Sequence, residues 1–147
     1  MLKASYERYA ERLEKIAAKR PASRFGITYE MCRAGLQAFD ERQVVVWLNY
    51  NFPTEIITAF GFVPFLYEIA AGFVSSNGEA RGYLEAAEQR QYSRDSCSYH
   101  RVAIGGALEG YFPPPTLSVG VSQPCDGQAK VAEIVKAAGL LPRPEME

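Results

Sequence analysis

The sequence has few of the residues that mark several specialised classes of protein. It contains three cysteines among 147 residues, and so small and odd a number does not suggest the disulfide framework of a secreted domain. Its longest apolar stretch, residues 56–71, is interrupted by polar residues, so no run reaches the roughly 18 apolar residues that a membrane span needs. The first 20 residues are charged throughout and lack the apolar core of a signal peptide. We therefore expect a cytoplasmic protein with no membrane association.

The chain also lacks an excess of charge of either sign. It has 16 Lys and Arg residues against 17 Asp and Glu, which gives a formal net charge of −1. This balance argues against electrostatic binding to nucleic acid or to an anionic membrane. Hydrophobic residues make up 48% of the chain and charged residues 22%, as in an ordinary globular protein. We expect residues 1–147 to form a single domain with no nucleic-acid partner.

Residues 1–40 are expected to form a helical N-terminal segment. In residues 2–20 apolar side chains recur at steps of three and four, which predicts a helix that ends before a proline. A loop is predicted over residues 22–28, and a second helix over residues 29–39.

Residues 43–139 are expected to form an α/β core. Residues 43–48 (QVVVWL) are apolar and β-branched, as in a strand buried on both faces of a parallel sheet. The other predicted elements are strands at 62–66 and 116–121, helices at 54–60, 79–91, 97–108 and 128–138, and a loop at 72–78. The alternation predicts an α/β fold, with a small three-stranded parallel sheet flanked by helices and an N-terminal helical extension.

Two loops follow predicted strands and are candidate ligand sites. In open α/β sheets, ligands bind beyond the carboxyl ends of the strands. Residues 49–55 contain Glu55, and residues 122–127 contain Cys125. If the two strands are parallel and adjacent, Glu55 and Cys125 face one crevice. Glu55 can instead simply interact with the dipole of its own helix.

Two of the three cysteines precede predicted helices. Free backbone N–H groups and the helix dipole stabilise a thiolate there, and this would apply to both Cys97 and Cys125. A free cysteine is also commonly a small buried hydrophobe, which is the interpretation for Cys32 and an open alternative for the other two. His100, the single histidine, is interpreted as a polar packing residue rather than a base.

Three sequence blocks resemble the N-terminal part of the D-component family of 2-hydroxyacyl-CoA dehydratases, which includes subunits of benzoyl-CoA reductase. The blocks are PTEIITAFGFVP at residues 53–64, SCSYHR at residues 96–101, and residues 119–130, which contain PCDG. They occur in the order and at the spacing of the family and span a little over half of the chain.

The resemblance implies an iron–sulfur enzyme. Members hold a cluster, typically [4Fe–4S], and by motif Cys97 and Cys125 are similar to two of its ligands, with Ser98 and Asp126 beside them as supporting residues. Glu55 matches a glutamate of the substrate pocket, which implies proton handling near the thioester. An ATP-dependent activator protein supplies one low-potential electron, with which the dehydratases remove water from a 2-hydroxyacyl-CoA and the benzoyl-CoA reductases reduce the aromatic ring.

The sequence departs from the family after residue 139. Family subunits continue into a second α/β domain that supplies a further cysteine ligand, so the ligand set of this chain is expected to be incomplete. A second subunit or the missing C-terminal domain would have to complete it. Two alternatives remain: a shortened non-catalytic paralogue that binds a partner subunit or an acyl-CoA without a cluster, and a redox protein in which Cys97 and Cys125 form a thiol pair.

Overall fold

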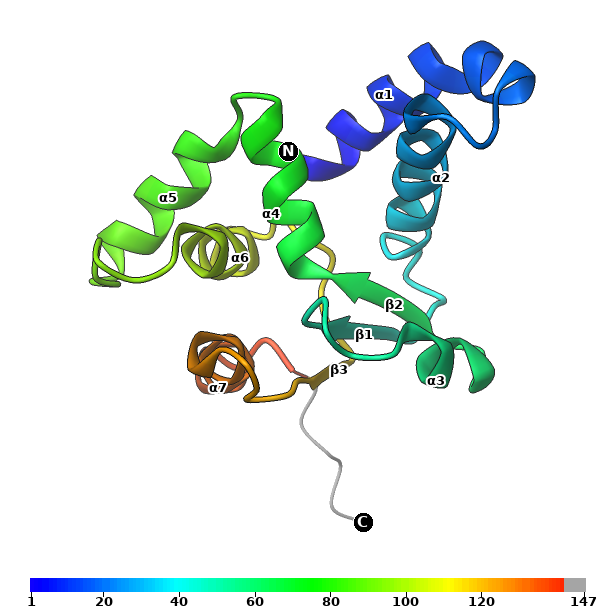
Figure 1. The fold of residues 1–147 in the computed structure, drawn as a ribbon. Coiled ribbons are helices and arrows are strands. Elements are labelled where there is room, and N and C mark those ends of the chain that lie inside the picture. Colours follow the sequence, from blue (N-terminus) through cyan, green and yellow to red (C-terminus); the bar gives the residue numbers. More distant parts are fainter. Residues whose placement is uncertain (142–147) are drawn as a thin grey trace.

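The computed structural model describes residues 1–141 of the chain. Its elements run in the order α1 (Leu2–Lys19), α2 (Arg24–Gln37), β1 (Val45–Leu48), α3 (Thr54–Ala59), β2 (Val63–Leu66), α4 (Tyr67–Ser76), α5 (Ala80–Gln89), α6 (Ser98–Leu108), β3 (Leu117–Val119) and α7 (Asp126–Ala137). Figure 1 shows the sheet with helices on either side and the α1–α2 pair extending from it. Within the described residues, no helix combines the length and hydrophobicity needed to cross a membrane.

The sheet is parallel, with the strand order β2-β1-β3. The chain passes from the central strand β1 through α3 to β2 on one side, and returns through α4, α5 and α6 to β3 on the other. The expected small three-stranded parallel sheet with flanking helices is thus confirmed. Because β1 connects to β2 on one side and the chain then crosses back to β3 on the other side, the carboxyl ends of β1 and β3 form a topological switch point, where α/β sheets bind ligands.

The main core lies between one face of the sheet and the helices α4, α5 and α6. Trp47 of β1 is fully buried there, and its Nε1 donates a hydrogen bond to the carbonyl oxygen of Pro113 at 2.9 Å. The ring centroid of Phe65 lies 5.4 Å from that of Trp47. The opposite face is covered by α3, where Ile57 packs against Val46 and Leu48. Alternate residues of β1 therefore enter two separate cores, which explains its uninterrupted apolar run.

The N-terminal helical extension packs against α4. Tyr6 is buried, and its ring centroid lies 4.9 Å from that of Phe73 in α4. Two hydrogen bonds to Glu79 add to this contact, from Ser5 at 2.6 Å and from Arg8 at 2.7 Å. The extension thereby shares the main core with the sheet.

Two predicted loops are helical. Part of the first one, residues 22–28, belongs to α2, whose start is capped by Ser23 Oγ accepting the Gly26 N–H at 3.3 Å. Most of the second, residues 72–78, is the second half of α4. There the burial of Phe73 and Val74 in the main core outweighs the loop tendency of the nearby glycine, serine and asparagine residues.

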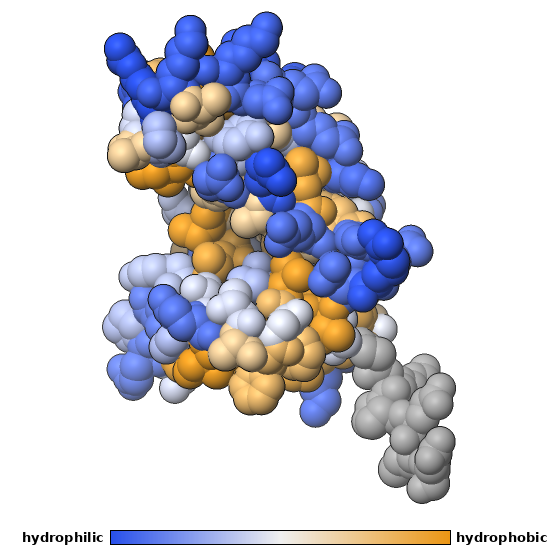
Figure 2. Space-filling view, turned by 90° about the vertical axis from the view of Figure 1, so that its right-hand side faces the viewer, coloured by the Kyte–Doolittle hydropathy of each residue, from blue (hydrophilic) through white to orange (hydrophobic). Residues whose placement is uncertain are grey.

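The surface around α3 and β2 carries exposed apolar side chains. Phe60 is 70% exposed and stacks on Phe62, with ring centroids 6.0 Å apart. Ile56 of α3 is also exposed. Figure 2 shows hydrophobic residues gathered across the middle of this side of the molecule, below a hydrophilic upper part where α1 and α2 lie.

Candidate functional site

A cavity of about 320 Å³ lies beyond the carboxyl end of β1, between the first turns of α4, α6 and α7. Its lining residues are Tyr50, Asn51, Glu68, Ile69, Cys97, Tyr99, His100, Pro124, Cys125 and Gln128. Three helix N-termini thus meet at the edge of the sheet where the strand order reverses. Their free N–H groups make this edge favourable for anionic groups.

Two predicted site residues, Cys97 and Cys125, both line this cavity. Cys97 is the N-cap residue of α6 and Cys125 is the N-cap residue of α7. Both are exposed free thiols, whereas the third, Cys32, is fully buried in the main core. Burial raises the pKa of the Cys32 thiol to about 11, which makes that thiol unreactive. The two thiols of the cavity are therefore the chemically available ones.

The other predicted site residues lie outside the lining of the cavity. Ser98 and Asp126 are the first residues of α6 and α7, and both are exposed. Glu55 is exposed in α3, although β1 and β3 are adjacent and parallel as its prediction required. Since α3 packs on the face of the sheet opposite to α4 and α6, the cavity does not include Glu55. The roles of these three residues stay predictions.

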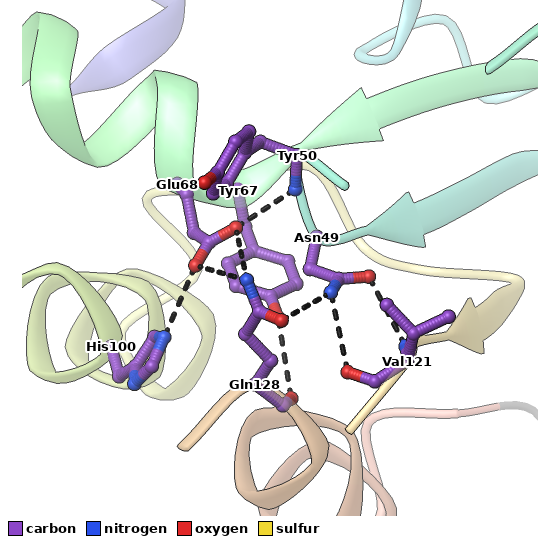
Figure 3. Close-up of polar contacts among 7 residues, drawn as sticks. All are labelled: Asn49, Tyr50, Tyr67, Glu68, His100, Val121 and Gln128. Atoms are coloured by element: carbon purple, nitrogen blue, oxygen red, sulfur yellow. Dashed lines mark hydrogen bonds and ion pairs between the residues drawn. The ribbon is translucent and has the colours of Figure 1, made fainter. Parts of the chain in front are cut away.

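The carboxylate in the cavity belongs instead to Glu68, in the first turn of α4. It accepts hydrogen bonds from three donors (Figure 3): from the N–H of Tyr50 at 2.8 Å, from Nε2 of Gln128 at 3.2 and 3.4 Å, and from Nε2 of His100 at 3.2 Å. A carboxylate can only accept, so the imidazole of His100 must carry its proton on Nε2. His100, interpreted from the sequence as a packing residue, is thus a polar partner at the site.

The pKa of Glu68 is lower than the ordinary value for a glutamate. Burial alone would raise this pKa, but the hydrogen bonds from His100, the Tyr50 N–H and Gln128, together with the charge interaction with His100, outweigh burial. The N-terminus of α4 also favours the charged form. Glu68 is therefore an anion at neutral pH, and its side chain is only 11% exposed.

A second set of hydrogen bonds joins the ends of β1 and β3 to α7. The fully buried Asn49 donates from Nδ2 to Oε1 of Gln128 at 2.7 Å and to the carbonyl oxygen of Val121 at 3.3 Å. Its Oδ1 accepts the N–H of Val121 at 3.3 Å. The hydroxyl of Tyr67 donates to the backbone oxygen of Gln128 at 3.2 Å. Figure 3 shows that these bonds and those of Glu68 form one continuous network at the floor of the site.

Sequence reasoning missed Glu68, Gln128 and Asn49. Two of them left a signal: Glu68 interrupts the longest apolar run, and Asn49 directly follows the buried strand. Gln128 left none, because its position in an amphipathic helix does not reveal that it is buried.

The cavity also offers an unused hydrogen-bond donor. Asn51 lines it, and in the described part of the chain its Nδ2 atom is buried without a hydrogen-bond partner. Ile69, Tyr99 and Pro124 supply apolar wall. An apolar wall with a few polar groups suits a small, largely apolar ligand that carries an acceptor oxygen.

The thiols fit part of a metal-binding set. Iron–sulfur clusters are held by thiolates, usually four, and Cys97 and Cys125 are exposed free thiols at the N-cap positions of α6 and α7. Within residues 1–141 no group of three or more His, Cys, Asp or Glu side chains is placed to hold a metal ion. The described residues therefore place two thiols at this cavity, and a cluster here would need its remaining ligands from elsewhere.

Comparison with known proteins gives a consistent family match. Residues 49–144 match the family described as 2-hydroxyglutaryl-CoA dehydratase, D-component. The chain is also similar to the (R)-phenyllactyl-CoA dehydratase alpha subunit of Clostridium sporogenes, with 33% identity over 78 residues, which are 53% of this chain. The matched part is 19% of the length of that relative. No solved structure gave a significant match.

Proposed function

The chain belongs to the 2-hydroxyglutaryl-CoA dehydratase D-component family, and from this premise we propose that it serves, as a subunit or part of one, in one-electron reductive chemistry on an acyl-CoA. The observation that carries the proposal is the cavity at the switch point of the sheet, which both Cys97 and Cys125 line. In this proposal residues 1–147 act as one domain, with residues 43–139 as the α/β core and residues 1–40 as its helical extension.

Cys97 and Cys125 are the proposed ligands of a [4Fe–4S] cluster. Such a cluster, when bound, would supply the low-potential electron for the reaction. The chain would contribute two sulfur ligands, from the N-cap positions of α6 and α7. Ser98 and Asp126, next in sequence, are proposed to orient the ligands. A second subunit or a further domain would supply the rest of the ligand set.

The proposed substrate is an acyl-CoA thioester, either a 2-hydroxyacyl-CoA or an aromatic acyl-CoA as in benzoyl-CoA reductase. The similar Clostridium protein is the alpha subunit of an (R)-phenyllactyl-CoA dehydratase, and phenyllactyl is a 2-hydroxyacyl group with an aromatic ring. Ile69 and Tyr99 offer apolar wall to such a group, and Nδ2 of Asn51 offers a donor to its oxygen. Glu55 remains the proposed proton-handling residue, since its exposed side chain is open to a ligand larger than the cavity.

The proposed partners are a second dehydratase or reductase subunit and an ATP-dependent activator protein, in the cytoplasm. The exposed, stacked Phe60 and Phe62 support a protein contact, because aromatic residues are enriched in protein interfaces. Size-exclusion chromatography with mass determination tests this part. A ligand-free monomer in every preparation would argue against the partner.

A cluster-free binding module is the second candidate. It is favoured by the placement of only two thiols at the cavity, with Cys32 buried in the main core of the described residues. In this case the cavity would hold an acyl-CoA or a partner segment without iron.

Anaerobic purification with iron and acid-labile sulfide assays separates the two candidates. The chain is purified with any subunit that accompanies it and is also reconstituted with ferrous iron and sulfide. We expect iron and sulfide in a stoichiometric ratio. Both should be lost in Cys97→Ser and in Cys125→Ser and should be kept in Cys32→Ala. Colourless protein without iron, even with the partner subunit present, would leave only the cluster-free module.

A further inference from the structure

His100 and Gln128 occupy the same position in two different helices. His100 is the third residue of α6 and lies three residues after Cys97, whereas Gln128 is the third residue of α7 and lies three residues after Cys125. Both side chains donate to the same atom, Oε1 of Glu68, at 3.2 Å each. One carboxylate therefore links the two helix ends that carry the exposed thiols (Figure 3).

We propose that Glu68 is a positioning residue that fixes the separation between Cys97 and Cys125. One part of this inference rests on the proposed function: that the separation serves to present both sulfur atoms to a single ligand. The separation itself is a property of the free protein. It follows from hydrogen bonds among residues that are present whether or not a cluster binds.

The attachment of Glu68 to the sheet makes this link rigid. Its other oxygen, Oε2, accepts the N–H of Tyr50, directly after the end of β1. Gln128 is in turn bonded through Oε1 to Asn49, also at the end of β1. Hydrogen bonds through Glu68 and Gln128 thus connect both thiol-bearing helices to Asn49 and Tyr50, at the end of β1. Hydrogen bonds to an ionised acceptor are about twice as strong as neutral ones, and those from His100 and Gln128 are partly buried.

No direct bond duplicates this link. Within residues 1–141, no side-chain hydrogen bond joins α6 to α7, so Glu68 is their shared polar partner. The neighbouring ion pair of Arg101 with Glu88, at 2.9 Å, holds α6 to α5 instead. Loss of Glu68 would leave three donors without their acceptor, and the two helix ends would then be held to each other by direct packing without a polar link.

Spin-label distance measurement on the metal-free protein tests the proposal. Nitroxide labels are attached to Cys97 and Cys125 in a Cys32→Ala background, and the distance distribution is recorded by electron paramagnetic resonance. We expect one narrow distribution. In Glu68→Met, which keeps the length of the side chain but accepts no hydrogen bond from His100 or Gln128, we expect the distribution to broaden and its mean to shift.

Each of two further variants removes one arm of the link, that is, the hydrogen bonding of either His100 or Gln128 to Glu68. His100→Phe keeps a ring against its neighbours, and Gln128→Met keeps the length of the side chain, but neither can bond to Glu68. We expect each to broaden the distribution, and we expect either one combined with Glu68→Met to add little, since the arms act through the same group. Glu88→Gln, which breaks the pairs with Arg94 and Arg101, is the matched control and should leave the distribution unchanged.

The outcomes distinguish this proposal from the proposed function. A folded Glu68→Met protein with an unchanged distribution would overturn the positioning role, whatever the iron content of the protein. If that variant does not fold, as judged by circular dichroism, the two single-arm variants decide in its place. A protein that never binds iron but shows the expected broadening would retain the positioning role and lose the cluster.

Discussion

The ring of His100 lies directly against the backbone of Gly127, where the first turns of α6 and α7 meet. A Cβ atom added to Gly127 would overlap Nδ1 and Cε1 of that ring. The glycine is required here for close approach of the two helices and not for an unusual backbone conformation. The same contact holds the imidazole in place for its hydrogen bond to Glu68.

Gly127→Ala should therefore destabilise the protein and displace His100 from Glu68. We expect a loss of about 1–3 kcal/mol in the free energy of unfolding, the usual cost of overpacking, measured by urea denaturation. Gly82→Ala in α5 is the control, because the added methyl group has room there, 3.7 Å from the nearest atom of Met1. The control should gain up to about 1 kcal/mol from helix propensity. Equal effects of the two substitutions would contradict the packing argument.

The sequence predicted the sheet because its signals are local. The β-branched run that contains Val45 and Val46 and the alternation of strands with helices were enough for three parallel strands and their order of appearance. The continuation of α4 through residues 72–76 was missed, because its local residues favour a loop and its stability comes from burial in the main core.

The site was predicted only in part for the same reason. Cys97 and Cys125 each precede a helix, a pattern that can be read within a few residues, and the rule for strand ends places Cys125, though not Cys97, at the edge of the sheet. The network behind them joins residues far apart in the chain: Gln128 and Glu68 are 60 residues apart, and His100 and Glu68 are 32 apart. Such pairings depend on the tertiary arrangement, and no periodicity in a single sequence reveals them.

The contribution of Glu68 to stability should disappear in acid. Its hydrogen bonds, opposed by burial, lower its pKa in the folded state below the ordinary value of 4.5. The ionised carboxylate therefore stabilises the folded state above that ordinary pKa, and the contribution is lost as the pH falls through the lower folded pKa. We expect the difference in unfolding free energy between the unmodified protein and Glu68→Gln to be full near pH 7 and to shrink below about pH 4.5. A difference that stays constant down to about pH 3 would show that the charge of Glu68 is not what stabilises the site.

Thiol reactivity should separate the cysteines into two classes. Cys97 and Cys125 are exposed at helix N-termini, whereas Cys32 is buried and its pKa is raised to about 11. Under reducing, metal-free conditions we expect a chromogenic thiol reagent to modify Cys97 and Cys125 rapidly in the folded protein and Cys32 only after denaturant is added. Cys32→Ala should abolish the slow class and leave the rapid one intact. Rapid modification of Cys32 in the folded protein would contradict its place in the core.

Glu55 offers a test that separates chemistry from stability. Its side chain is exposed on α3 and outside the lining of the cavity, so Glu55→Gln should change the unfolding free energy by less than about 0.5 kcal/mol. If Glu55 transfers a proton during turnover, the same variant should lower kcat of the assembled enzyme by roughly 10²–10⁴-fold, the usual contribution of a general acid or base. Glu41→Gln, another exposed glutamate, is the matched control and should leave both quantities unchanged. Full turnover by Glu55→Gln would remove Glu55 from the reaction and leave Glu68 as the carboxylate that the cavity itself presents.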